Sequence, residues 1–554
     1  MSAILSAETL NDFIAPSIAC IKPVESLPPP PPTELSVSVE DAMNTPADAK
    51  TAAQISLTDC LACSGCVTSS EAVLVSMQSH NEVLSALSQS SEKKFVALLS
   101  PQTKAALAVA VGGTAEEAEA MITRLLTEEL AKEGNGGKGF EVVLDTNPFR
   151  TLSHFYAARE VAEGMQGVGE QKKPVLASSC PGFICYLEST HPELIPHLSA
   201  LKSPQAIAGT FVKSLMIGEQ TVKSPEDVYV VSIMPCFDKK LEGARGELTS
   251  AAWWEEDSTW VETPVRDVDC VITTREILSL AQAKGIDFVS LSRTPMPTPI
   301  FSADPAIQKF LTTPPKNGAR DAGTSGGTLA TIINEILSRH PESTLSIQQG
   351  RNVDTIEYLV LSPSGETIAK LSRCYGFRNI QNLVRKLKPP KARVLPQFGS
   401  KKPAGAAMAA AGRRVAAKKA GESKDDKAVY VEVMACPGGC TNGGGQIKWD
   451  DEALWKELGF DKWANQRELL ARVDEAYFSS SEDAEVEGKG NPVVNEKPLS
   501  EGLLQDAVSA WMRISGVLED TLVKTTYRKV ANDIGGRLGE KEVLELASRT
   551  GGGW

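Results

Sequence analysis

The chain has 554 residues and a formal net charge of −13, and 42% of its residues are hydrophobic. This length predicts several domain-sized units with enough apolar residues for a large core, and the acidic balance argues against direct nucleic-acid binding. No apolar run approaches the roughly 20 residues of a membrane span, and no basic-then-apolar leader opens the chain, so we expect no signal peptide and a cytoplasmic protein.

The N-terminal segment, residues 1–93, combines a linker with a cysteine run. Residues 26–50 begin with consecutive prolines and continue with polar residues, which is typical of an exposed linker. Cys60, Cys63 and Cys66 then follow in a C-x2-C-x2-C pattern. This pattern is typical of a [4Fe–4S] cluster, so the sequence predicts an iron–sulfur site in this segment.

Three thiolates are too few for that cluster, and the fourth ligand must come from elsewhere. Ferredoxin runs place another cysteine four residues after the third, where this chain has Ser70. Cys20, on the other side of the linker, is the best candidate because the linker can fold back. The alternative for Cys20 is an ordinary unpaired thiol.

From residue 94 the chain alternates short apolar runs with amphipathic stretches as far as residue 477. This alternation predicts an α/β core with largely parallel sheets. The predicted strands are 94–100, 140–147, 174–180, 228–236, 268–274 and 428–436. The predicted helices are 114–132, 148–163, 274–284, 328–339 and 377–388.

Two segments interrupt or follow this core. Residues 389–427 have almost no bulky apolar side chain and are predicted to be a disordered basic insertion. Their Lys and Arg pairs suit either a nuclear localisation signal or, the interpretation we favour, a solvated loop. Residues 478–498 are predicted to form an acidic loop. A helical C-terminal segment and tail, 499–554, ends on Trp554.

Four further cysteines follow predicted strands. Cys180, Cys236 and Cys436 come directly after three of them, and Cys440 follows four residues later. Ligands bind outside the carboxyl ends of parallel strands, so we expect these thiols to converge at one edge of one sheet. Four converging thiolates at irregular spacing suit an iron–sulfur cluster. The glycines after Cys440 are expected to let backbone N–H groups approach the cluster sulfurs.

Two other interpretations of these four cysteines stay open at this point. Buried cysteines often pack as small hydrophobic residues, which is how we interpret Cys185, Cys270 and Cys374. Zinc sites are usually built from two local ligand pairs. Only one such pair, Cys436 and Cys440, is present among the four, so iron is the favoured metal.

Five ordered segments between about Lys94 and Gln446 resemble signatures of the [FeFe]-hydrogenase family. They read ASSCPGF, IMPCFDKKLE, VDCVITTRE, GTSGG and VMACPGGCTNGGGQ. The resemblance implies a two-lobed hydrogenase-like α/β core with a small ferredoxin-like N-terminal segment. It implies that Cys180, Cys236, Cys436 and Cys440 hold the [4Fe–4S] part of the active-site cluster. Cys440 matches the thiolate that bridges to a di-iron unit, and Lys239 matches a lysine that contacts a cyanide of that unit.

Departures from the family pattern bear on activity. Hydrogenases carry a proton-relay cysteine where this chain has Ser179. A hydroxyl with a pKa far above that of a thiol is a poor relay at neutral pH. An acid of the family's proton path is matched by Ala157, although Glu160 is nearby in the sequence. We therefore expect no catalytic residues and a protein that is not an enzyme.

The combination of retained cluster cysteines and a missing relay cysteine resembles the eukaryotic branch of the family. This branch includes nuclear-architecture-related and prelamin-A recognition factor-like proteins. The resemblance implies two [4Fe–4S] clusters and a role in cytosolic iron–sulfur protein assembly. The implied partners are a scaffold complex, a targeting complex with a WD-repeat protein, and apo iron–sulfur proteins. The implied location is the cytoplasm, with the nucleus as a further site. A terminal aromatic residue such as Trp554 resembles a signal that the targeting complex reads.

Two other functions remain as alternatives. One is a redox enzyme of residual [FeFe]-hydrogenase type that uses the core cluster. The other is a nuclear interaction protein in which the clusters are structural. Ser179 disfavours the first, and the sequence does not separate transfer of clusters from a structural role.

Overall fold

A computed structural model describes residues 77–89, 92–135, 137–167, 173–253, 264–297, 299–313, 322–350, 352–388, 428–459, 463–479 and 501–529. The expectations about the N-terminal cysteines, the linker, the basic insertion, the acidic loop beyond residue 479 and Trp554 lie outside the described residues. The cysteines concerned are Cys20, Cys60, Cys63 and Cys66. Within the described ranges, no helix has the length and hydropathy that a membrane crossing requires.

Four parallel strands form the first sheet, which we call sheet A. They are β1 (Lys94–Leu99), β2 (Val142–Asp145), β4 (Val228–Met234) and β5 (Cys270–Thr273), in the order β2-β1-β4-β5. Neighbouring residues of β1 enter two different hydrophobic clusters, Leu99 one and Leu98 the other. Because side chains alternate along a strand, sheet A is buried on both faces.

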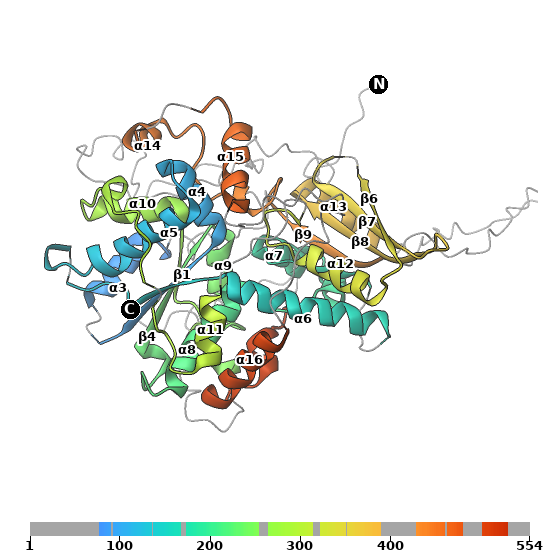
Figure 1. Ribbon diagram of the computed structural model, residues 1–554, viewed down its shortest axis with the longest axis horizontal. Coiled ribbons are helices and arrows are strands. Elements are labelled where there is room, and N and C mark those ends of the chain that lie inside the picture. The colour runs from blue at the N-terminus through green and yellow to red at the C-terminus, as the bar shows by residue number, and fades with distance from the viewer. Residues whose placement is uncertain are drawn as a thin grey trace, which may run out of the picture.

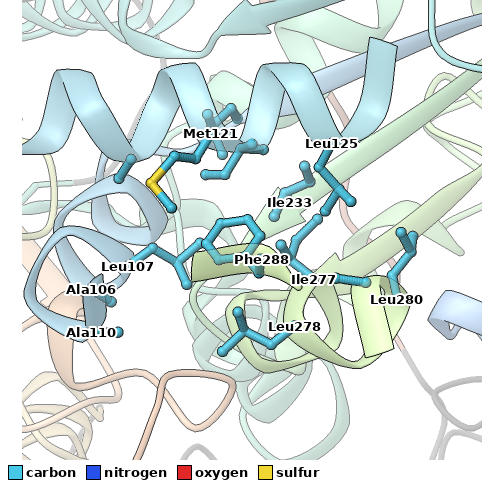
Figure 2. Packing of buried hydrophobic residues seen from close by; sticks show 14 of the residues in the cluster. Ala106, Leu107, Ala110, Met121, Leu125, Ile233, Ile277, Leu278, Leu280 and Phe288 are labelled. Carbon is cyan, nitrogen blue, oxygen red and sulfur yellow. The ribbon is translucent and has the colours of Figure 1, made fainter. Parts of the chain in front are cut away.

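Helices cover both faces of sheet A. The first cluster includes residues of α3 (His80–Gln89), α4 (Pro101–Val111), α5 (Ala115–Arg124), α10 (Thr274–Ala283), α14 (Glu452–Glu457) and α15 (Gln466–Phe478). The second includes residues of α6 (Asn147–Met165), α8 (Pro204–Gly218), α11 (Pro305–Thr312), α16 (Glu501–Ser515) and α17 (Glu519–Val523). Figure 2 shows the first cluster from close by, with Leu107, Met121 and Phe288 gathered beside Ile233 of β4.

Five strands form the second sheet, sheet B. They are β3 (Val175–Ala177), β6 (Thr344–Gln349), β7 (Thr355–Leu361), β8 (Thr367–Tyr375) and β9 (Ala428–Met434), in the order β3-β9-β8-β7-β6. The half formed by β3, β9 and β8 is parallel, and the half from β8 to β6 is antiparallel. Strands β6, β7 and β8 were not predicted from the sequence; their side chains are mostly half-buried or exposed.

Sheet B is also covered on both faces. Residues of α7 (Pro181–Thr190) and α13 (Phe377–Leu387) form one cluster, and residues of α12 (Thr328–Arg339) and the second half of α6 form the other. The first half of α6 packs on sheet A, with Phe149 and Leu152 buried there. This long helix therefore joins the two sheets, and Figure 1 shows it running between them.

The predicted α/β class is confirmed, and every strand and helix predicted in the core is present with ends shifted by a few residues. The predicted helix 114–132 consists of α5 followed by a π-helical turn, Leu125–Glu129. A short helix, α9 (Asp238–Gly243), follows β4 and positions residues discussed below.

Candidate metal centre

Local structure places three of the four core cysteines just after buried strands and the fourth at the start of a short helix. Cys180 follows β3 and is the N-cap residue of α7, whose first helical residue is Pro181. Cys236 follows β4, and Cys436 follows β9. Cys440 begins a short 3-10 helix, Cys440–Asn442. Proline fits the first turn of a helix because its missing N–H needs no partner there, so α7 can start directly at the thiol.

The expectation that one sheet would deliver all four thiols is wrong. Cys236 comes from sheet A, whereas Cys180, Cys436 and Cys440 come from sheet B. The four thiols nevertheless border the same cavity, which lies where the two sheets meet. The apolar runs of the sequence predicted where the strands end. They did not predict which strands pair, because pairing is set by contacts between distant segments.

This cavity holds about 820 Å³ of space between protein atoms, solvent at its mouth included. Cys180 and Cys436 are buried, and Cys236 and Cys440 are half-buried. The lining comes from three groups of residues besides the cysteines: two helix starts, the loop before α12 and the inner face of α6. The main contributors are Ser100, Pro101, Gln102, Arg150, His154, Ser179, Pro204, Gln205, Lys239, Ser325 and Gly326.

Burial raises the pKa of all four thiols, and repulsion from neighbouring thiols adds to it at Cys180, Cys236 and Cys436. Burial raises the pKa of Cys180 to about 12, with a further contribution from Asp238. Burial also raises the pKa of Cys236 and Cys436 well above the ordinary value, and each of them senses the other thiols. The pKa of Cys440 is raised by burial, against the opposing effects of a hydrogen bond with Ser325 and the charge of Lys239. Thiolates are the metal-binding form, so this donor set needs a cationic centre to become charged.

The spacing of the thiols separates two kinds of metal site. Among the residues that the structure describes, no three His, Cys, Asp or Glu side chains stand close enough to share one metal ion. A mononuclear zinc ion needs its four ligands at about 2.0–2.3 Å from one centre. The four thiols that border one cavity are the donor type that would hold an iron–sulfur cluster.

Glycines lock the loop that follows Cys440 against the Cys236 loop. A Cβ added to Gly443 would lie 2.3 Å from the carbonyl oxygen of Pro235, and the N–H of Gly445 donates to the same oxygen at 2.9 Å. These contacts give Gly443 and Gly445 a packing role, and the approach of backbone N–H groups to cluster sulfurs stays a prediction. Small residues are required because two backbones touch at the junction of the sheets.

Lys239 lies on the cavity wall and belongs to a buried polar network. Its Nζ lies 2.9 Å from Oε2 of Glu242. The same carboxylate accepts hydrogen bonds from Ser203 at 2.8 Å and from Gln205 at 2.9 Å. Oε1 of Gln205 has no hydrogen-bond partner among the described residues. The network fixes a positive charge beside the four thiols, which favours an anionic thiolate centre.

The positions discussed for proton relay are also resolved. Ser179 is half-buried and lines the cavity. Glu160, by contrast, accepts a hydrogen bond from Oγ of Ser199 at 2.7 Å, and Ala157 is buried in the cluster beside α12. The described lining residues of the cavity include neither of them.

Several lining residues were not predicted from the sequence. Ser100–Gln102 and Ser203–Gln205 both read SPQ at the start of a helix, and this repeated tripeptide was the available signal. His154 also lines the cavity, with its Nδ1 3.2 Å from Oγ1 of Thr331. Burial, followed by the charge of Arg150, lowers the pKa of His154 to about 3.

The remaining described cysteines lie away from the cavity wall. Cys270 in β5 and Cys374 in β8 are buried, as predicted for core residues. Cys185 in α7 is half-buried.

Comparison with known proteins identifies the family. The iron only hydrogenase large subunit, C-terminal domain, matches residues 93–444. This chain belongs to that family. A relative from Chaetomium globosum, named cytosolic Fe-S cluster assembly factor NAR1, is 45% identical over 602 residues and covers 100% of both chains. A relative of the same name from Sclerotinia sclerotiorum is 46% identical over 594 residues, again with 100% of both chains covered. The chain is thus a hydrogenase-like protein related to these assembly factors.

A solved hydrogenase shows the same fold. The apo [FeFe]-hydrogenase HydA1 from Chlamydomonas reinhardtii superposes with a TM-score of 0.50 at 20% identity, covering 81% of this chain and 99% of that one. The hydrogenase-like fold predicted from the five sequence segments is confirmed. The described cysteines fit the iron–sulfur chemistry of the family, because four thiols border one cavity with a buried cation beside them.

Proposed function

We propose that this protein is a cytosolic iron–sulfur assembly factor whose core site holds a [4Fe–4S] cluster on Cys180, Cys236, Cys436 and Cys440. The observation that carries the proposal is the convergence of these thiols, from both sheets, on one cavity. Three further features support it: the raised thiol pKa values, the buried Lys239 and the close junction of two loops at Gly443. Such a cluster would supply charge neutralisation for thiols that are otherwise buried.

A second [4Fe–4S] cluster is proposed on Cys20, Cys60, Cys63 and Cys66. Its support is the C-x2-C-x2-C spacing and the position of Cys20 beyond the linker. The protein would then carry one cluster enclosed by the α/β core and one in the N-terminal segment. A weakly enclosed cluster is more labile than an enclosed one, so the N-terminal cluster is the one expected to leave more readily.

The assembly role is supported by the names of the full-length relatives. In this role the protein receives clusters from a scaffold complex and passes them to apo-proteins through a targeting complex that includes a WD-repeat protein. The cytosol is the proposed location, in line with the same names. The clusters are cargo in this scheme, and the thiol sites are carriers.

A redox enzyme of residual hydrogenase type is the competing function. The fold favours it, but a hydroxyl, Ser179, occupies the cavity wall where the family pattern has a relay thiol. We expect no hydrogen evolution from the reconstituted protein with a low-potential electron donor. Hydrogen evolution above that of a Cys436→Ala control would decide for the enzyme.

The direct test is anaerobic reconstitution followed by iron counting, EPR and a transfer assay. Two clusters predict about eight irons per chain. The loaded protein, separated from free iron and sulfide, should activate an apo-enzyme that requires a [4Fe–4S] cluster. Zinc bound without charge-transfer absorbance, or loaded protein that activates no acceptor, would contradict the proposal.

A further inference from the structure

The loop that carries Cys436 and Cys440 reaches the surface at one point. Pro437 and Gly438 are exposed, whereas Cys436 on one side and Gly439 on the other are buried. The N–H of Gly438 donates to Oδ1 of Asp354 at 2.7 Å. A molecule bound over these two residues would therefore meet the thiol loop directly.

Helix α13 begins beside this exposed point and presents cations. A Cβ added to Gly376, the residue before the helix, would lie 3.7 Å from Cγ of Pro437. Ile380 and Val384 anchor the helix in the core, while Arg378 and Lys386 lie exposed. The sequence of α13, FRNIQNLVRKL, contains no acidic residue. The exposed face of this helix is therefore basic at both ends and carries no acidic side chain.

An exposed apolar side chain completes the surface. Val353 is 67% exposed in the turn before β7. Asn352 in the same turn donates from Nδ2 to Oδ1 of Asn379 in α13 at 3.1 Å, and the N–H of Tyr375 donates to the carbonyl oxygen of Asp354 at 2.9 Å. These bonds hold the turn, the helix and the thiol loop in a fixed arrangement. An apolar centre with charged groups around it is the usual anatomy of a protein-binding surface.

The charge of this surface contrasts with that of the whole chain. The net charge is −13, but α13 is basic and the segment that follows it, 389–427, holds far more Lys and Arg than Asp and Glu. An acidic protein is the complementary partner. Nucleic acid fits less well, because single strands bind on exposed aromatic side chains, and the exposed side chains described on this surface, among them Asn352, Val353 and Pro437, are not aromatic.

We propose that an acidic recipient protein docks on the surface formed by α13, the turn 352–354 and Pro437–Gly438, with an apolar side chain against Val353. This inference rests on the proposed function, since it places the recipient of a cluster beside the core thiol loop. Opposite charges speed the encounter, and the apolar contact slows dissociation.

The test uses the full-length, cluster-loaded protein and an apo-aconitase-type acceptor of net negative charge. The variants are the double charge reversal Arg378→Glu/Lys386→Glu and, separately, Val353→Asp. The matched control is Lys223→Glu/Lys456→Glu, which reverses two exposed cations elsewhere and gives the same net charge. Iron content and thermal stability should be unchanged in all variants, because every substituted side chain is exposed.

We expect the Arg378/Lys386 reversal to raise the Kd for the acceptor about tenfold at low salt and to flatten its salt dependence, while the control behaves as wild type. Val353→Asp should weaken binding at both low and high salt. Equal weakening by the control, or binding of a 20-nucleotide single strand that the reversal abolishes, would overturn the docking surface. Failure of the wild-type protein to transfer any cluster would instead count against the proposed function.

Discussion

The two sheets differ most in how their strands meet solvent. In sheet A, Leu98 and Leu99 of β1 are fully buried on opposite faces. In sheet B, the outer strand β6 has no buried residue, and its Ile347 is 45% exposed. Burial also differs between the strands of sheet B itself, because the parallel strands β3 and β9 are largely buried whereas β6 is not. The thiols all follow buried parallel strands, so the metal centre rests on the most tightly packed part of each sheet.

This arrangement shows why a thiol centre can be built between two sheets. Each buried strand fixes the position of the cysteine that follows it, and the loops meet across the junction through Gly443 and Pro235. The described strands β6 and β7 contain none of the four cysteines, and most of their side chains are half-buried or exposed. Figure 1 shows α13 beside sheet B, away from α10 and α14.

The largest expected effect comes from removing a core thiol. Cys436→Ala should lower iron from about eight to about four per chain, because the core cluster loses a ligand. It should also lower thermal stability, since metal-binding energy contributes to folding. Cys63→Ala should lose a similar amount of iron but keep the melting temperature of the core. Cys374→Ala, which removes a buried thiol away from the cavity, should keep all the iron, and iron loss there would contradict the ligand assignment.

Truncating one side chain in each sheet should show how tightly each of the two strands is packed. Leu98→Ala removes a fully buried side chain of sheet A and should cost about 2–5 kcal/mol in the free energy of unfolding. Ile347→Ala in the exposed strand β6 should change it by about 0.5 kcal/mol. Urea unfolding at equilibrium measures both. Similar costs at the two positions would mean that β6 is covered in solution.

The close backbone contact between Gly443 and Pro235, where the two sheets meet, can be tested by adding one methyl group. In Gly443→Ala the new Cβ meets the carbonyl oxygen of Pro235 at 2.3 Å, and we expect a loss of about 3 kcal/mol. Gly502→Ala is the control, because nothing lies within 4 Å of that site near the start of α16. The control should stabilise slightly, since alanine favours helix. Iron content after reconstitution should fall in the first variant and not in the second.

The smallest expected effect is a pH dependence from His154. Its folded pKa of about 3 lies below the unfolded value, so its contribution to stability is fully present above about pH 6.5 and is lost as pH falls toward 3. Between pH 6.5 and 5 this amounts to about 2 kcal/mol at 1.4 kcal/mol per pH unit. Urea titrations at the two pH values measure the free energy of unfolding. In His154→Gln, the decrease of this free energy between pH 6.5 and 5 should be smaller by that amount. An unchanged slope would show that this imidazole is not kept neutral in the folded chain.

Elements marked by a local apolar run could be predicted from the sequence. The apolar runs before Cys180, Cys236 and Cys436 predicted three strands, and the structure contains β3, β4 and β9 there. The alternation in β6–β8 was missed because half-buried strands show little apolar contrast. The position of His154 on the cavity wall was not predicted because it depends on α12 and on other lining residues that lie far away in the sequence.

The sequence by itself determined the residue types, the strand ends that carry thiols and the family that these segments resemble. These features are local, since a strand and the cysteine after it are encoded within about ten residues. Only the tertiary structure decided that one thiol comes from sheet A and three from sheet B, and that glycines join the two loops by backbone contact. It also placed Gly376, the residue before α13, beside Pro437. Such facts depend on which distant segments pack together, and packing between distant segments is set by the shape of the whole core.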